Sequence, residues 1–213
     1  MQKTILTILL NIFFVLSIAQ NTDLEFKDGI YLNFNQVKTN SPITREQIIT
    51  DIEKDDIDFY EKLLEQDYIK FIDKGITKTI EVNQIWGFCD EGSLYIHFGN
   101  DFAKLIAKGF LGYFIATQIV SYYDYPYYNT YYYDPYYNYQ RTSKEMRHYI
   151  IDFASGKIYE FNPKNLAFLL KLYDTQLYNE YINLSKRKQK KLIFYYLRLF
   201  NKRNLLSLQQ KKS

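Results

Sequence analysis

The sequence predicts an α+β fold in which a mostly antiparallel β-sheet of sequential hairpins is followed by two or three C-terminal helices. Between residues 29 and 161, short apolar runs are separated by turn-forming residues, a pattern typical of strands and hairpins. From residue 163 onward, leucines recur at helical spacing. Because the strands come first and the helices last, we expect segregated sheet and helix layers instead of alternating strand–helix units.

The strands of the first half are predicted to follow one another closely. Their expected positions are residues 29–32, 68–72, 78–82, 85–88, 94–98, 102–107 and 110–120. The last of these runs is apolar enough to be covered on both faces. Residues 89–93 contain Asp, Glu and Gly and predict a hairpin loop. Residues 33–40 are expected to be a turn-like connector. Residues 51–65 fit neither helix nor strand, so their type stays open.

A further hairpin is expected in the second half of the chain. Regular structure is predicted to resume at Met146, a tight turn follows at Ser155-Gly156, and residues 158–161 form the returning strand. The hairpin leads directly into the helical part.

The helix starts are predicted from capping residues. Asn162 followed by Pro163 predicts the first helix, because Asn caps well and Pro at the first helical position loses no hydrogen bond. Asp174 is expected to cap a second helix. Ser185 is a candidate cap for a third helix, but the second could also continue through residues 186–200. Consecutive basic residues at a helix start oppose the helix dipole, which favours the continuous helix.

The first nineteen residues predict export. Lys3 precedes an apolar run from Ile5 to Ile18, and Ser17 and Ala19 are small residues at the positions that a cleavage site requires. This is the layout of a secretory signal peptide. The alternative is a retained membrane anchor, but the run is shorter than the ~20 residues of a spanning helix and contains Asn11. Residues 1–19 are therefore expected to be removed. This leaves residues 20–213 as a single periplasmic or extracellular domain without a transmembrane segment.

Composition excludes several classes of function. The formal net charge of +3 is too small to indicate a nucleic-acid partner. Cys89 is the only cysteine, so no internal disulfide can form. With two histidines there is no cluster at zinc-ligand spacing, and neither a metal nor a cofactor is expected.

One thiol site can be formulated from the sequence. Cys89 and His97 flank the predicted hairpin loop and would be close enough for a nucleophile and its base. No recognisable nucleophile motif surrounds Cys89, so a small packing residue is the preferred interpretation.

A basic run occupies residues 186–191. Its Lys and Arg side chains could contact anionic lipid or acidic polysaccharide, or they could form a solvated helix surface. Because a helix would spread them around most of its circumference, the solvated surface is preferred.

The tyrosine tract of residues 122–139 carries the preferred binding hypothesis. It holds 11 of the 23 tyrosines, and a Pro-Tyr-Tyr-Asn repeat occurs twice within it. Tyrosine rings on a loop can stack on sugars or contact proteins. The expected ligand-binding residues are Tyr127, Tyr128, Tyr136 and Tyr137. Alternatively, the tract is a low-complexity insertion that covers the nearby sheet.

Three short blocks stand out along the mature chain, together with its helical C-terminal part. They are Asp28-Gly29-Ile30-Tyr31 with Lys38 and Pro42 downstream, Trp86-Gly87-Phe88-Cys89-Asp90 running into Leu94-Tyr95-Ile96, and Asp152-Phe153 with Gly156-Lys157-Ile158. In these blocks the chain resembles a group of uncharacterised secreted bacterial proteins. The resemblance implies export and the predicted architecture, and it implies no catalytic residue.

The function expected from the sequence is a non-catalytic binding or surface-interaction module whose partner is a glycan or a surface protein. The rival is a secreted hydrolase that uses dispersed carboxylates such as Asp90, Glu91 and Asp152. A pair of catalytic carboxylates about 5 to 10 Å apart would favour the hydrolase.

Overall fold

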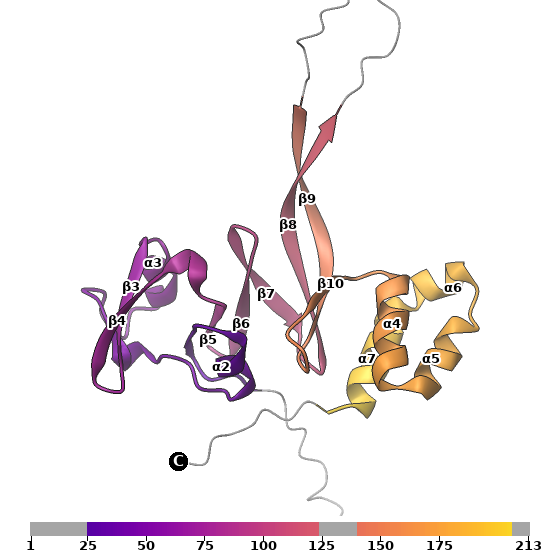
Figure 1. Cartoon of the computed structure of the whole chain (residues 1–213), viewed down its shortest axis with the longest axis horizontal. Coiled ribbons are helices and arrows are strands. Elements are labelled where there is room, and N and C mark those ends of the chain that lie inside the picture. Colours follow the sequence, from indigo (N-terminus) through magenta and orange to yellow (C-terminus); the bar gives the residue numbers. More distant parts are fainter. Residues whose placement is uncertain (1–24, 124–139, 206–213) are drawn as a thin grey trace, which may run out of the picture.

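The computed structural model describes residues 25–123 and 140–205 and confirms the predicted α+β fold (Figure 1). A seven-stranded antiparallel sheet has the order β1-β5-β6-β7-β8-β9-β10, and a three-stranded antiparallel sheet has the order β2-β3-β4. The larger sheet is built from β1 (Gly29–Tyr31), β5 (Gly87–Asp90), β6 (Ser93–Phe98), β7 (Asp101–Ala107), β8 (Leu111–Tyr123), β9 (Gln140–Asp152) and β10 (Ile158–Glu160).

The β5–β6 hairpin is confirmed, with a shorter loop than predicted. Asp90 pairs with Ser93, so only Glu91 and Gly92 form the turn. Both have positive φ angles, 48° and 69°, as a type I′ turn requires. Asp28 Oδ1 accepts a hydrogen bond from Gly92 N at 3.0 Å, which ties the turn to the segment before β1.

The two faces of the larger sheet are covered by different parts of the chain. On one face, alternate residues of β5 to β9 pack against the N-terminal segment, which contributes Phe26 and Val37. On the opposite face, β5 to β7 contact the smaller sheet, whereas β8 and β9 contact the C-terminal helices. The strands therefore hold the smaller sheet and the helices at opposite ends, as Figure 1 shows.

The smaller sheet consists of β2 (Ile48–Ile49), β3 (Tyr68–Asp73) and β4 (Ile76–Glu81), and a 3-10 turn η2 (Val82–Gln84) follows it. Two segments before β3 contain helices that the sequence did not indicate. The predicted connector at residues 33–40 holds α2 (Phe34–Lys38), and the region left open holds α3 (Phe59–Leu64). Each is only about one and a half turns long, too short for its apolar spacing to be diagnostic.

The β8–β9 hairpin extends beyond the body of the molecule as a two-stranded arm (Figure 1). The prediction that residues 110–120 are covered on both faces is correct only for the inner half. Farther out, Ile119 is 62% exposed, and Met146, which pairs with Thr117 from the other strand, is 78% exposed. Regular structure resumes at Gln140, not at Met146, because cross-strand pairing with β8 continues to that point.

Four helices follow the sheet: α4 (Pro163–Tyr173), α5 (Thr175–Ile182), α6 (Lys186–Lys191) and α7 (Ile193–Arg203). Both predicted caps are confirmed, since Asn162 accepts from Asn165 N and Asp174 accepts from Leu177 N, each at 2.9 Å. The favoured continuous helix is wrong: the chain is extended at Ser185, with φ −60° and ψ 152°. None of the helices in the described residues has the length and apolar character that a membrane crossing needs.

Candidate functional site

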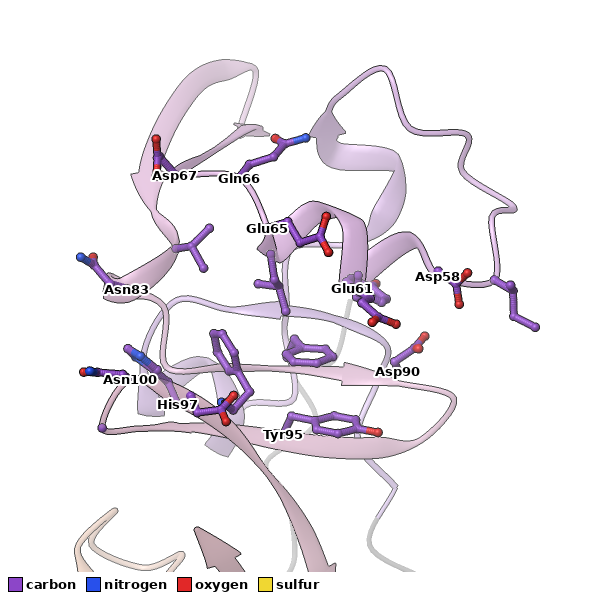
Figure 2. A pocket seen from close by; sticks show the side chains of 18 residues that line it. Asp58, Glu61, Glu65, Gln66, Asp67, Asn83, Asp90, Tyr95, His97 and Asn100 are labelled. Atoms are coloured by element: carbon purple, nitrogen blue, oxygen red, sulfur yellow. The ribbon is translucent and has the colours of Figure 1, made fainter. Parts of the chain in front are cut away.

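A pocket of about 740 Å³ lies between α3 and the face of β5, β6 and β7 (Figure 2). Its floor is a cluster of aromatic rings. Phe88 and Tyr95 are cross-strand neighbours whose rings stack 4.6 Å apart at an interplanar angle of 2°. Phe102 meets Phe88 edge-on at 5.4 Å, and Tyr60 of α3 lies 5.8 Å from Phe88. The sheet register therefore builds a flat apolar base.

Polar side chains surround this base, and their charge is one-sided. Figure 2 shows that they come from α3, from the segment after it and from the β5–β7 strands. Six carboxylates line the pocket, from Asp58, Glu61, Glu65, Asp67, Asp90 and Asp101. Among the residues that the structure describes, no lysine or arginine lines it. Within the described residues, Asp90 is the only one of the six that forms a salt bridge. We call this site the acidic pocket.

Two cations beside the acidic pocket already lie over aromatic rings that line it. The Arg45 guanidinium lies 4.7 Å from the ring centroid of Tyr60, and Lys104 Nζ lies 5.6 Å from that of Tyr95. Arg45 is also hydrogen-bonded to Asp90, so its charge is largely neutralised. Rings and carboxylates at this end of the molecule thus form the combination that binds cations.

Tyr60 is a rigid part of the floor. Its side chain is 1% exposed, and its hydroxyl has no hydrogen-bond partner among the described residues. Burial raises the pKa of Tyr60 to about 12, although the adjacent Arg45 acts in the opposite direction. The phenol therefore stays neutral at physiological pH.

The structure does not bring Cys89 and His97 together. Cys89 pairs with Leu94 and points to the opposite face of the sheet, where Sγ donates to the carbonyl of Phe26 at 3.5 Å. Burial raises the pKa of the Cys89 thiol to about 12. His97 lies in the acidic pocket, with its ring 5.0 Å from that of Phe102. The thiol–imidazole hypothesis is wrong, and Cys89 is a packing residue, as preferred.

Of the carboxylates named for a hydrolase, Asp152 lies far from Asp90. Asp90 lies on β5 and Asp152 on β9, four strand spacings or about 19 Å away across the sheet. Asp152 is buried and accepts hydrogen bonds from Ala154 N, Ser155 Oγ and Tyr173 Oη at 2.9, 2.6 and 2.7 Å. These contacts hold the β9–β10 turn against α4, which is a structural role. Glu91 is exposed in the β5–β6 turn.

In the part of the chain that the structure describes, no three His, Cys, Asp or Glu side chains are grouped so that they could hold a metal ion. Figure 2 shows Asp58, Glu61 and Asp90 on one side of the acidic pocket and Asp67 on the other. A partner that extends across the pocket fits this arrangement better than a point charge does.

The predicted ligand-binding tyrosines, Tyr127, Tyr128, Tyr136 and Tyr137, lie outside the described residues. The described residues that flank this segment are Tyr123, the last residue of β8, and Gln140, the first of β9, which pair with each other at the outer end of the arm. Tyr122 and Tyr123, which were counted in the loop, belong to β8.

Acidic and basic side chains are concentrated in different parts of the chain, although the net charge of the whole chain is small. Residues 25–107 carry 16 acidic and 9 basic side chains, whereas residues 140–205 carry 5 acidic and 14 basic ones. The first range includes the smaller sheet and the acidic pocket, and the second includes the four C-terminal helices. Counting charges over each half of the sequence would have revealed this polarity, whereas the total does not.

Comparison with family models, with curated protein sequences and with solved structures finds no match for this chain. Function is therefore inferred from the chain's own residues. The features available for that inference are the acidic pocket, the β8–β9 arm and the charge polarity.

Proposed function

We propose that the chain is an exported, non-catalytic binding module whose acidic pocket holds Lys or Arg side chains of a partner protein. The observation that carries this proposal is the excess of carboxylates, unmatched by any lining cation, around a floor of stacked rings. Export is supported by the apolar leader of residues 1–19 and by the resemblance to secreted bacterial proteins.

The physical chemistry of the pocket favours a cation that has a flat or extended shape. A guanidinium can contact the aromatic floor while its donors reach carboxylates such as Glu61 or Asp101, and such charge-assisted bonds are stronger than neutral ones. The surrounding negative charge also attracts cations over a distance, which raises the association rate at low salt. Binding should therefore weaken as salt screens the pocket.

A glycan is the alternative ligand for the same pocket. A sugar ring can stack on an aromatic side chain, and the amides of Gln66, Asn83 and Asn100 could donate to its hydroxyls. An uncharged sugar, however, does not use the excess of carboxylates. Its binding would change little with ionic strength, so salt dependence separates the two ligands.

The test is calorimetric titration of residues 20–213 with a penta-arginine peptide and, separately, with neutral oligosaccharides. In one variant Glu61→Gln and Glu65→Gln remove two pocket charges. In the control, Glu53→Gln and Asp55→Asn remove two charges from exposed positions that do not line the pocket. We expect the pocket variant to bind penta-arginine at least fivefold more weakly, with little change in the control. Equal losses, or binding of only the oligosaccharides, would contradict the proposal.

The β8–β9 arm supports a second contact site of the same functional class. From Ile115 outward, β8 pairs with β9 alone among the described strands, so Tyr123 and Gln140, which flank residues 124–139, lie beyond the part of the sheet that packs the core. We propose that this tyrosine-rich segment contacts a glycan or a surface protein. Replacing residues 124–139 with Asn-Gly joins the paired strands by a two-residue turn and should leave the fold intact. Glycan-array signals that persist after this replacement would exclude a glycan role for the tract.

A further inference from the structure

A second pocket, of about 450 Å³, lies at the basic end of the molecule between the start of α4, the end of α5 and α6. Three lysines line it: Lys164 of α4 and Lys186 and Lys190 of α6. The remaining lining residues in the described part of the chain include the apolar Ala167 and Ile182, and none of them is acidic. We call it the basic pocket.

A buried glutamine fixes α6 in the position that forms this pocket. Gln189 is 2% exposed, and its Nε2 donates to the carbonyls of Ile182 and Leu184 at 3.3 and 3.0 Å. Tyr181 Oη donates to the carbonyl of Gln189 at 3.1 Å. These hydrogen bonds hold α6 against the end of α5. Lys186 and Lys190 are one helical turn apart on α6, and both line the basic pocket.

The charge on α6 is unfavourable within the folded chain. Five of its six residues are basic and exposed. Among the described residues none of them forms a salt bridge. Like charges four residues apart and cations in a first helical turn both destabilise a helix, each by a few tenths of a kcal/mol to about 1 kcal/mol. An anionic ligand in the basic pocket would relieve this repulsion.

Exposed apolar side chains lie beside the basic pocket. Lys164, Phe168 and Leu172 occur at intervals of four residues on α4 and therefore follow one stripe of the helix. Phe168 is 51% exposed and Leu172 57%, and Ile182 in the pocket wall is 38% exposed. Lysines next to exposed apolar residues on one helical surface are typical of proteins that bind anionic lipid surfaces.

We infer that the basic pocket binds the phosphate-bearing head group of an anionic phospholipid, and that Phe168 and Leu172 contact the interfacial region of the same lipid surface. Free phosphate shares the head-group chemistry, but it would leave the apolar stripe in water. This inference departs from the solvated surface that the sequence favours, and the observation behind it is that the structure places Lys186 and Lys190 beside Lys164.

Cosedimentation with vesicles tests this inference. Residues 20–213 are used, because the apolar leader would itself partition into lipid. The vesicles are pure phosphatidylcholine or phosphatidylcholine with 30% phosphatidylglycerol. The pocket variant carries Lys164→Gln, Lys186→Gln and Lys190→Gln. The control carries Lys144→Gln, Lys157→Gln and Lys202→Gln, which removes three exposed lysines from the same half of the chain outside the pocket.

We expect binding to the anionic vesicles only, with at least a tenfold loss in the pocket variant and no more than a threefold loss in the control. Thermal unfolding of each variant verifies that it is folded. Equal losses in the two variants would show nonspecific attraction and overturn the site. Calorimetric binding of inorganic phosphate without vesicle binding would overturn the lipid assignment. A Phe168→Ser variant that binds vesicles as the unsubstituted chain does would overturn the role of the apolar stripe.

Discussion

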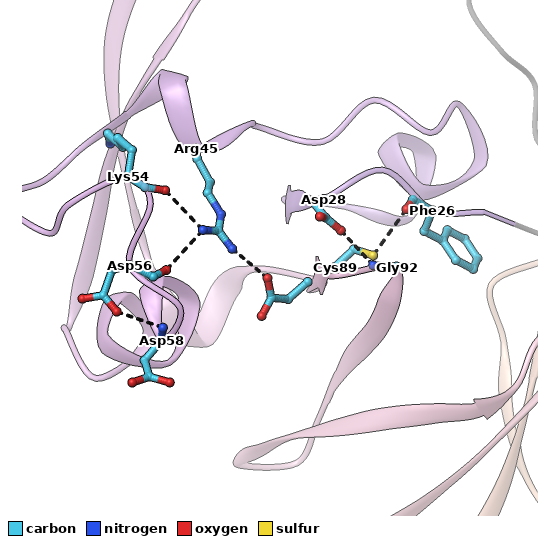
Figure 3. Close-up of polar contacts among 9 residues, drawn as sticks. Phe26, Asp28, Arg45, Lys54, Asp56, Asp58, Cys89 and Gly92 are labelled. Carbon is cyan, nitrogen blue, oxygen red and sulfur yellow. Dashed lines mark hydrogen bonds and ion pairs between the residues drawn. The ribbon is translucent and has the colours of Figure 1, made fainter.

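Arg45 and Asp90, 45 residues apart in the sequence, form an ion pair of 2.8 Å between Nη2 and Oδ1 that joins the 3-10 turn Arg45–Gln47, which immediately precedes β2, to strand β5 of the larger sheet (Figure 3). Nη1 of the same guanidinium donates to the carbonyls of Lys54 and Asp56 at 3.2 and 3.3 Å. One side chain thus fixes the end of β5, the loop before α3 and the wall of the acidic pocket.

Replacing Arg45 with methionine should destabilise the protein by about 1–3 kcal/mol, because a carboxylate and two carbonyls lose a charged donor. Urea unfolding monitored by the fluorescence of Trp86, the only tryptophan, measures the loss. Lys62→Met is the control, since Lys62 pairs with Asp56 at a more exposed position and contributes less. A larger loss in the Lys62 variant would refute the structural role of Arg45.

Cys89 should be unreactive in the folded protein. Burial raises the pKa of its thiol from 9.0 to about 12, so almost no thiolate exists at pH 8.5. Iodoacetamide at that pH should label Cys89 slowly in buffer and rapidly in concentrated urea. A raised pKa also means that the stability contributed by the thiol is complete below pH 9 and is lost as the pH rises toward 12. Cys89→Ala should therefore reduce the alkaline loss of stability, and buried tyrosines such as Tyr60 and Tyr181, whose pKa values are also raised, account for the rest. Rapid labelling of the native protein would contradict the burial.

The Asp174 side chain caps α5 and forms an ion pair with Arg203, and two substitutions can measure the contribution of each contact to stability. Its Oδ1 caps α5, and its Oδ2 lies 3.6 Å from Arg203 Nη1. Asp174→Asn keeps a capping oxygen and should cost less than about 1 kcal/mol, the upper range for a partly exposed ion pair. Asp174→Ala removes both contacts and should cost about 1–2 kcal/mol. Thermal unfolding compares the two, and equal losses would show that the ion pair, not the cap, stabilises this junction.

Signals confined to a few neighbouring residues were readable from the sequence. Glu91-Gly92 determines the tight turn of the β5–β6 hairpin, and Asn162 and Asp174 determine two helix starts, because each acts on the backbone within three residues. The sequence does not favour a break at Ser185, because basic residues make an unfavourable start for α6. The break forms because the hydrogen bonds of buried Gln189 to Ile182 and Leu184 hold α6 in place, and these are tertiary contacts that the local sequence does not show.

Contacts between distant residues could not be read in the same way. Gly29 pairs with Cys89 across 60 residues, and α3 is stabilised by burial of Phe59, Tyr60 and Leu63, not by its short sequence pattern. The acidic pocket combines α3, η2 and three strands, so no single segment shows it. Only its charge excess had a signal in the sequence, the surplus of acids in residues 25–107.

The most direct test of the acidic pocket is an amide chemical-shift titration of ¹⁵N-labelled residues 20–213 with penta-arginine. If the pocket binds cationic side chains, the largest saturable shifts should occur at Glu61, Tyr95 and Asn100, with little change at Gln189 in the helical end. Raising the salt concentration from 50 to 500 mM should reduce these shifts in parallel. Saturable shifts centred on α4–α7, or none in the pocket at millimolar peptide, would contradict cation binding there.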